Sequence, residues 1–347
     1  MANSSCTISF YDLNCTGPSL SVRDRSIVLA LVALVNATTV AGNLLLIATV
    51  AFFRRLRSWP NVMALSLAVS DFLVGTLVMP LATVKAVYSC WFYADLLCHW
   101  HFFLDFSLTT CSILHVACIA YDRYVAVCDP LRYAARVTER TVGAMLALCW
   151  LGAALVSVPI LFSLSPALSP NTIHRILCPN DCFFYVHGLI IFVIQMGPYI
   201  ASVAFVVALY GQIYRAARLQ ARRIGGGGGG GGGGRGGGGG KSSSAEATAA
   251  AKSEHKATKQ LGIIIGCFLL SCLPFYLVDV VSLVDEALFV PYRITVLSGY
   301  ISSALNPLLF AKFNRQLRAG FAMVLRAQLF RPGARDTDFR GGGRRGE

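Results

Sequence analysis

Three charged residues lie within residues 97–127, a stretch that is otherwise apolar enough to enter a membrane. Asp105 lies in its first half, and Asp122 and Arg123 follow near its end. A charge inside a bilayer costs roughly 2.5–3.5 kcal/mol on insertion scales, so it usually marks a functional site. A buried carboxylate attracts a cation, and an adjacent aspartate and arginine can form an ion pair. The three residues are therefore candidates for ligand binding and for switching.

The spacing of Asp105 and Arg123 separates these two roles. They are 18 residues apart, which is roughly 27 Å along one α-helix at about 1.5 Å per residue. One charge would then lie in one half of a bilayer and the other near the opposite face. A single helix could connect a ligand site to a partner site.

The composition is that of a protein with several membrane spans. Of 347 residues, 55% are hydrophobic and 14% are charged, and the mean hydropathy is +0.61. A soluble protein of this length rarely has such values. The net charge of +13 could suggest nucleic acid, but the basic residues gather in a few loops between apolar runs. We therefore expect no nucleic acid partner. Residues 1–25 are polar and do not resemble a cleavable signal.

Seven apolar stretches reach the roughly 20 residues that a membrane-spanning helix needs. They cover residues 27–53, 61–87, 97–127, 141–165, 183–216, 257–284 and 291–312. Because a bilayer offers no water to free backbone groups, these stretches must be helices. The sequence predicts an all-α fold, a seven-transmembrane helix bundle with a short amphipathic C-terminal helix. Its expected parts are an N-terminal segment, the bundle, a membrane-surface helix and a tail, at residues 1–26, 27–312, 313–326 and 327–347.

Lysine and arginine set the expected orientation by the positive-inside rule. The segment between the fifth and sixth stretches is rich in both. Two further loops carry Arg54, Arg55, Arg57, Arg132, Arg136 and Arg140. The N-terminus should therefore lie outside a plasma membrane and the C-terminus inside. Asn3 and Asn14 begin glycosylation sequons, whereas the sequon at Asn36 lies within a span and should stay unmodified.

Two segments on the expected cytoplasmic side are not membrane spans. Residues 225–240 are glycine apart from Arg235, so a loop of about 220–250 should be a flexible coil. A phosphate-binding loop is the alternative, since Lys241 and Ser242 follow the run, but the neighbouring elements are membrane helices. The second segment predicts a helix on the membrane lipid. Its apolar face would hold Phe313, Leu317, Phe321 and Leu325.

Twelve cysteines fall into two groups. Six lie in or near the predicted helices and are expected to be small buried hydrophobes. The other six lie on the expected outer side, where disulfides persist; they are Cys6, Cys15, Cys90, Cys98, Cys178 and Cys182. Six cysteines allow 15 pairings, so the residues alone select none. A zinc site would have to use His99, His101 and His174, whose spacing is not that of metal ligands.

Short motifs occur in order along the predicted spans. They are Gly42-Asn43, the segment ending Ser70-Asp71, Asp122-Arg123-Tyr124, Trp150, Phe268 with Pro274, and Asn306-Pro307 with Phe310. Each motif alone is weak, but the ordered set is specific. Over roughly residues 25–325 the chain closely resembles the rhodopsin-like (class A) G-protein-coupled receptors.

The resemblance implies roles for these residues. Asp71 would form a buried network that holds water or a sodium ion, and no other cofactor is expected; a purely structural network is the alternative. The network would include Asn43, Ser112, Ser303 and Asn306. Arg123 would pair with Asp122 and Glu254 at rest and bind a heterotrimeric G protein when released. The other expected switch residues are Tyr124, Phe268, Cys272, Pro274, Pro307 and Phe310, with Pro274 kinking its helix.

Asp105 stands where the amine receptors of this family carry their ligand aspartate, so the resemblance implies a protonated amine as the ligand. Tyr300 would donate a hydrogen bond to the carboxylate, and Phe275 and Tyr276 would form aromatic walls. Ordinary helix packing is the alternative for these aromatic residues. The other expected ligand residues are Thr109, Gln195, Leu297 and Asp279.

Among amine receptors, the trace amine-associated group looks nearest, on residues 252–259 and on the spacing of Cys178 and Cys182. It implies a bridge between Cys98 and Cys182, and another from Cys178 to Cys6 or Cys15. Departures indicate a divergent, early-vertebrate branch: Cys272 and Leu297 stand where the group has tryptophan. The serines that bind catechols are absent, which disfavours catecholamines.

The expected function is an olfactory amine receptor that raises cyclic AMP through a stimulatory G protein, with arrestin and a receptor kinase as further partners. The alternative is a serotonin- or histamine-like receptor of another tissue. A transporter would show internal repeats, and an enzyme would show a nucleophile cluster within the spans; neither is found. Asp279 predicts a diamine or polyamine, because it would lie above the aromatic wall, across the cavity from Asp105. A solvated Asp279 is the alternative.

Overall fold

A computed structural model describes residues 21–88, 91–163, 193, 196–226, 262–278, 281, 297, 299–330 and 332–339. Within these residues every regular element is a helix. In chain order the longer ones are α1 (Val22–Phe52), α2 (Trp59–Leu73), α3 (Met79–Tyr88), α4 (Asp95–Cys128), α6 (Glu139–Ala147), α7 (Ala153–Ser163), α10 (Gly197–Gly226), Gly262–Val278, α13 (Ile301–Phe313) and α14 (Arg315–Leu325).

Short helical segments connect several of these elements. A π-helical turn, Val74–Val78, joins α2 to α3, and another, Leu148–Gly152, joins α6 to α7, so each pair forms one long span. The remaining short elements are Arg54–Leu56, Pro130–Arg132, α5 (Tyr133–Arg136), Gln328–Phe330 and Ala334–Asp336.

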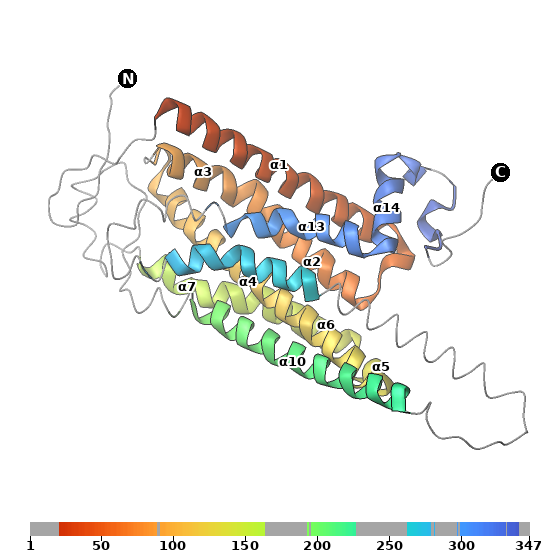
Figure 1. Cartoon of the computed structure of the whole chain (residues 1–347). Coiled ribbons are helices and arrows are strands. Elements are labelled where there is room, and N and C mark those ends of the chain that lie inside the picture. The colour runs from red at the N-terminus through yellow and green to blue at the C-terminus, as the bar shows by residue number, and fades with distance from the viewer. Residues whose placement is uncertain are drawn as a thin grey trace, which may run out of the picture.

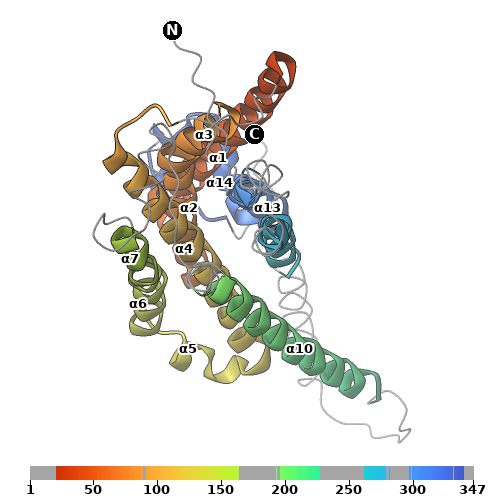
Figure 2. The ribbon, with the colours of Figure 1, turned by 90° about the vertical axis from the view of Figure 1, so that its left-hand side faces the viewer.

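The helices lie roughly side by side in one elongated bundle (Figure 1). α4 runs through its middle and contacts α2, α7 and α10. Figure 2 shows α4 between α6 and α7 on one side and α13 with the helix Gly262–Val278 on the other. α14 lies at one end of the bundle, beside the last turns of α1 and α13. We call this the α14 end.

Length and composition agree with a membrane bundle. Five of the described helical spans are long and apolar enough to cross a bilayer, and Gly262–Val278 is a shorter apolar helix. Large apolar side chains are exposed along them, including Leu34, Leu44, Leu155, Val207 and Leu270. Such surfaces are rare on a soluble protein and are expected where helices face lipid. The observed helices overlap all seven predicted spans.

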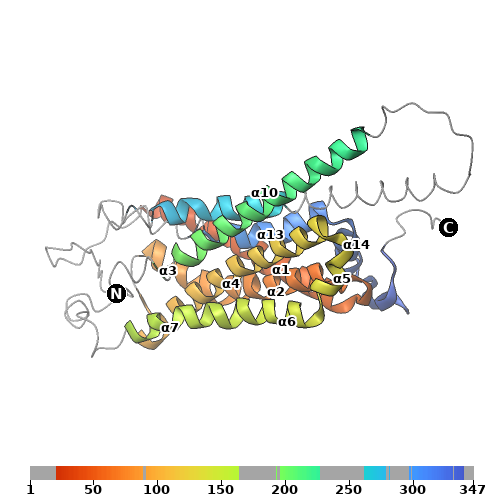
Figure 3. The same cartoon turned by 90° about the horizontal axis from the view of Figure 1, so that it is seen from below.

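α10 differs from its prediction at its C-terminal end. It continues to Gly226, ten residues beyond the expected end at 216 and into the segment expected to be a loop from about 220. Residues 214–223 contain no glycine or proline and are rich in alanine, arginine, leucine and glutamine, which are strong helix formers. In Figure 3 this part of α10 diverges from the other helices.

α14 packs through only part of its predicted apolar face. Asn314 caps its first turn, accepting hydrogen bonds from the backbone N–H groups of Gln316 at 3.0 Å and Leu317 at 3.2 Å. Leu317 and Phe321 are buried, but Leu325 is 74% exposed. Leu325 lies at the last residue of the helix, beyond the neighbours that cover Leu317. The predicted apolar face is therefore divided: Leu317 and Phe321 pack within the protein, whereas the Leu325 side chain remains available to lipid.

Gly42 is required by a close contact between α1 and α13. A Cβ atom at this position would lie 2.7 Å from Cγ of Pro307, and a proline ring cannot rotate away. We expect Gly42→Ala to lower the thermal unfolding midpoint of the purified protein in detergent, because overpacking costs typically about 1–3 kcal/mol.

Gly143→Ala is the matched control for this substitution. Gly143 lies in α6, where a Cβ atom would meet nothing within 4 Å. Alanine is roughly 0.5–1 kcal/mol more favourable than glycine within a helix, so this midpoint should stay level or rise. Equal midpoints for the two variants would refute the packing argument.

Candidate ligand and switch sites

Asp105 and Tyr300 form the first site, between α4 and the start of α13. The Tyr300 hydroxyl donates a hydrogen bond to Oδ2 of Asp105 at 3.0 Å. Tyr300 is 5% exposed and Asp105 is half-buried, so the pair is partly shielded from solvent. Ionised carboxylates in such surroundings are favourable only when cations or hydrogen-bond donors compensate them. The geometry is that of a cation site with one neutral donor already in place.

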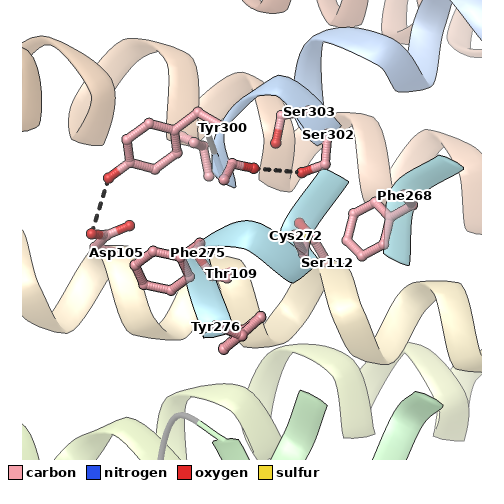
Figure 4. Close-up of a pocket in the computed structure, with 12 residues that line it drawn as sticks. Asp105, Thr109, Ser112, Phe268, Cys272, Phe275, Tyr276, Tyr300, Ser302 and Ser303 are labelled. Carbon is pink, nitrogen blue, oxygen red and sulfur yellow. Dashed lines mark hydrogen bonds between the residues drawn. The ribbon is translucent and has the colours of Figure 1, made fainter. Parts of the chain in front are cut away.

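A cavity of about 40 Å³ begins at Asp105 and runs between α4, α13 and the helix Gly262–Val278 (Figure 4). One water needs roughly 10–15 Å³ of such volume, so several water-sized groups fit. The lining residues are Val74, Asp105, Thr109, Ser112, Phe268, Cys272, Phe275, Tyr276, Gly299, Tyr300, Ser302 and Ser303.

A second buried carboxylate lies beyond this cavity. Oδ1 of Asp71 accepts hydrogen bonds from the hydroxyls of Ser303 at 2.8 Å and Ser112 at 3.2 Å, and Oδ2 accepts one from the Asn306 amide at 2.7 Å. The Asn43 amide donates to the backbone oxygen of Ser303 at 3.0 Å. The residues predicted for this network therefore lie together. Ser70, which was not predicted, joins it through Ser112 at 3.0 Å.

The expected aromatic walls divide between the cavity and the helix interface. Phe275 and Tyr276 both line the cavity. The Tyr276 ring also stacks on Tyr199 of α10 at 4.0 Å between centroids. Leu297 does not line the cavity; it belongs to a buried cluster that includes Tyr300, Leu108 and Val78. Its side chain therefore acts on the site through packing around Tyr300.

Asp122 and Arg123 form the switch candidate toward the α14 end of α4. Nε of Arg123 donates to Oδ2 of Asp122 at 2.7 Å, and Nη2 also contacts this oxygen. The Tyr133 hydroxyl of α5 donates to Oδ1 at 2.8 Å. Asp122 is fully buried, whereas the Arg123 side chain is 13% exposed. Arg123 is thus held by the carboxylate of the preceding residue, Asp122, which Tyr133 of α5 also fixes in place.

Comparison with known proteins assigns the family. Residues 42–310 match the family described as 7 transmembrane receptor (rhodopsin family). This chain belongs to the rhodopsin family of seven-transmembrane receptors. The receptor is 34% identical to trace amine-associated receptor 365 of Petromyzon marinus over 96% of the chain and 88% of that protein. It is 32% identical to trace amine-associated receptor 9 of Rattus norvegicus over 94% of each chain.

Membership of this family confirms the predicted fold, a seven-transmembrane helix bundle. It also makes the chain a multi-pass membrane receptor of the trace amine receptor type rather than an enzyme. Among the residues that the structure describes, no group of His, Cys, Asp and Glu side chains is arranged to hold a metal ion.

Several predicted site residues of the receptor lie outside the described residues. They are Gln195, Asp279, Glu254, Cys6, Cys15, Cys90, Cys178, Cys182, Asn3 and Asn14. Cys98 is disulfide-bonded, and its expected partner Cys182 is in this group. The six cysteines expected to be buried hydrophobes are free thiols: Cys111, Cys118, Cys128, Cys149, Cys267 and Cys272.

One buried hydrogen-bond cluster of the receptor was missed from the sequence. The indole N–H of Trp150 donates to Oγ of Ser66 at 2.9 Å, and His115 Nε2 lies 2.8 Å from the same oxygen. His115 Nδ1 lies 2.8 Å from the backbone oxygen of Cys111. Because a carbonyl only accepts, Nδ1 carries the proton and Nε2 accepts from Ser66. The presence of polar Ser66 and His115 within apolar spans could have indicated this buried hydrogen-bond cluster.

Lys85 lies near Asp105 and Phe102, which its position in the sequence did not predict. Its ammonium lies 4.3 Å from the centre of the Phe102 ring, one turn before Asp105 on α4. Its positive charge acts on both Asp105 and His101.

Proposed function

We propose that the receptor binds a protonated amine and that Asp105 holds its ammonium group. The observation that carries this proposal is the Asp105–Tyr300 pair, a half-buried carboxylate that lines a cavity. The electrostatic attraction between a cation and this carboxylate is stronger than it would be in water, since the surroundings have a low dielectric constant. The names of the two relatives given above, both trace amine-associated receptors, support the same ligand class.

The remaining ligand contacts follow from the lining of the cavity. Phe275 and Tyr276 offer aromatic faces to the ammonium or its neighbouring carbons, and Thr109 lies one turn below Asp105 on α4. Gln195 and Asp279 are further proposed contacts. We also propose a diamine or polyamine as the ligand, with Asp279 as one candidate for a second acidic contact.

Signalling is proposed to take place at the α14 end of the bundle. The positive-inside rule supports a cytoplasmic location for this end and an extracellular N-terminus, in the plasma membrane. We propose that Arg123, when released, binds a stimulatory G protein and raises cyclic AMP. Arrestin and a receptor kinase would act at the same end, and α14 would lie on membrane lipid. An olfactory tissue is the proposed site of expression.

Three further features belong to the same proposal. Asp71 would hold a sodium ion or water, since within the described residues it forms no ion pair and has only neutral donors. Cys98 would bridge to Cys182, and Cys178 to Cys6 or Cys15. Asn3 and Asn14 would carry glycans.

A serotonin- or histamine-like receptor of another tissue is the alternative, because the same carboxylate would serve those ligands. Tissue of expression separates it from an olfactory receptor. A ligand panel separates it further, since an olfactory trace amine receptor should respond to simple alkyl and aryl amines.

The proposed function predicts a response to amines alone. In cells that express the chain, a panel of protonated amines should include members that raise cyclic AMP, whereas alcohols of the same carbon skeletons should be inert. Equal responses to alcohols would refute the amine site. Amine responses that lower cyclic AMP, or leave it unchanged while calcium rises, would refute the stimulatory coupling only.

A further inference from the structure

The cavity joins two carboxylates that lie at different depths of the bundle. Asp105 lines it directly, and Ser112 and Ser303, which also line it, are the residues that donate to Oδ1 of Asp71. Figure 4 shows Thr109, Ser112, Cys272 and Ser302 along the cavity, on one side of Asp105. The side chains along this path are small, so the space below Asp105 continues toward the Asp71 network.

At the Asp71 end of the path, a buried carboxylate has no cationic partner among the described residues. Asp71 is fully buried, and the salt bridges among the described residues do not include it. A buried carboxylate is favourable when a cation neutralises it. In the same network the amide oxygen of Asn43 is buried without a hydrogen-bond partner, which provides a second acceptor for N–H groups.

The spacing along α4 between Asp105 and Ser112, which donates to Asp71, matches the length of a short diamine. Ser112 follows Asp105 by seven residues on α4, a rise of roughly 10.5 Å. An extended alkyl chain advances about 1.2 Å per single bond, so four or five methylenes set two nitrogens roughly 6–7 Å apart. A charge-assisted contact of about 2.8 Å at each end covers the remaining distance.

The opposite side of Asp105 repels a second cation. Lys85 lies beside Phe102, one turn before Asp105, whereas Ser112 lies two turns after it. A diamine anchored at Asp105 would place its second ammonium near a lysine if it extended that way. It would meet a carboxylate if it extended toward Asp71.

We propose that the receptor binds linear diamines with one ammonium at Asp105 and the other at the Asp71 network, the chain passing Cys272. This inference rests on the proposed amine function and specifies the ligand class of the same site. It differs from the placement of the second ammonium at Asp279. The cavity volume of about 40 Å³ holds roughly three or four water-sized groups at about 10–15 Å³ each, so the side chains along the path must move apart to admit the rest of the diamine.

The test measures the affinity ratio of a diamine to the monoamine of equal chain length. Both displace a labelled monoamine from membranes that contain the full receptor, for chains of three to eight methylenes. A second charge-assisted contact should favour the diamine by roughly 10–100-fold, with the largest ratio at four or five methylenes. Cys272→Trp should close the path and bring this ratio close to one.

Matched variants separate the possible outcomes. Cys272→Ser retains a small side chain and should retain the ratio, and Asp279→Asn should retain it as well. A ratio that survives Cys272→Trp, or that falls with Asp279→Asn, overturns the inner placement. Equal affinities of monoamines and diamines in the unmodified receptor also overturn it, while leaving the amine function intact. Failure of both ligand types to bind refutes the proposed function itself.

A salt titration tests the same point without any substitution. Sodium would compete with the inner ammonium at Asp71, so replacing potassium by sodium at constant ionic strength should weaken diamines more than monoamines. Asp71→Asn should remove this difference. Equal effects of sodium on the two ligand types would overturn the placement, even if Cys272→Trp fails to reach the membrane.

Discussion

Replacing Asp105 with alanine is expected to lower amine potency by at least about 100-fold, because breaking a buried charge pair costs roughly 3–5 kcal/mol and every 1.4 kcal/mol is about tenfold. The carboxylate lines the cavity and accepts a hydrogen bond from the neutral hydroxyl of Tyr300. The measurement is a cyclic AMP dose–response curve, with surface expression determined in the same cells.

Tyr300→Phe is the graded companion of this variant. It removes the hydrogen bond at 3.0 Å and keeps the ring in its cluster with Leu297 and Leu108. Because a hydrogen bond to a charged group contributes about 1.5–3 kcal/mol, we expect a smaller loss than for Asp105→Ala. An undiminished amine response in Asp105→Ala would remove the amine site, whatever the behaviour of Tyr300→Phe.

The sequence predicted those parts of the fold that depend on long apolar runs. Each observed span lies within a few residues of its expected limits where the helix ends at a charged or polar turn, as at Arg54 or Asp129. It failed at α10, where no membrane boundary stops the helix at 216. There the helix-forming residues continue the hydrogen bonding in a region without an apolar pattern.

The candidate site was predictable where a charge had to be explained inside an apolar span. Asp105, Asp122 and Arg123 are costly unless paired, so their positions alone marked them as candidate functional residues. Asp71 was assigned only through the family resemblance. Ser66 and His115 are neutral and form hydrogen bonds with one another, so they raised no comparable signal. The continuity of the cavity past Cys272 depends on which side chains face it from three helices, which a single sequence does not specify.

The second large effect is expected at Asp122. Its carboxylate accepts from Arg123 and from the Tyr133 hydroxyl, and it is fully buried. Asp122→Asn keeps the size of the side chain and removes the charge that restrains Arg123. If this restraint contributes about 1–1.5 kcal/mol to the resting state, its loss shifts the resting–active equilibrium by roughly 5–12-fold. Cyclic AMP without ligand should rise accordingly, and Glu254→Ala should change it in the same direction.

Asp129→Asn provides the matched control at the same end of the bundle. Asp129 pairs with Arg136 at 3.2 Å, and both side chains are substantially exposed. Exposed pairs contribute little, typically about 0–1 kcal/mol, so this variant should leave cyclic AMP without ligand unchanged. Tyr133→Phe should fall between the two, since it removes one neutral donor and leaves the ion pair. A flat basal signal in Asp122→Asn, in cells that still respond normally to amine, would show that the pair does not restrain the receptor.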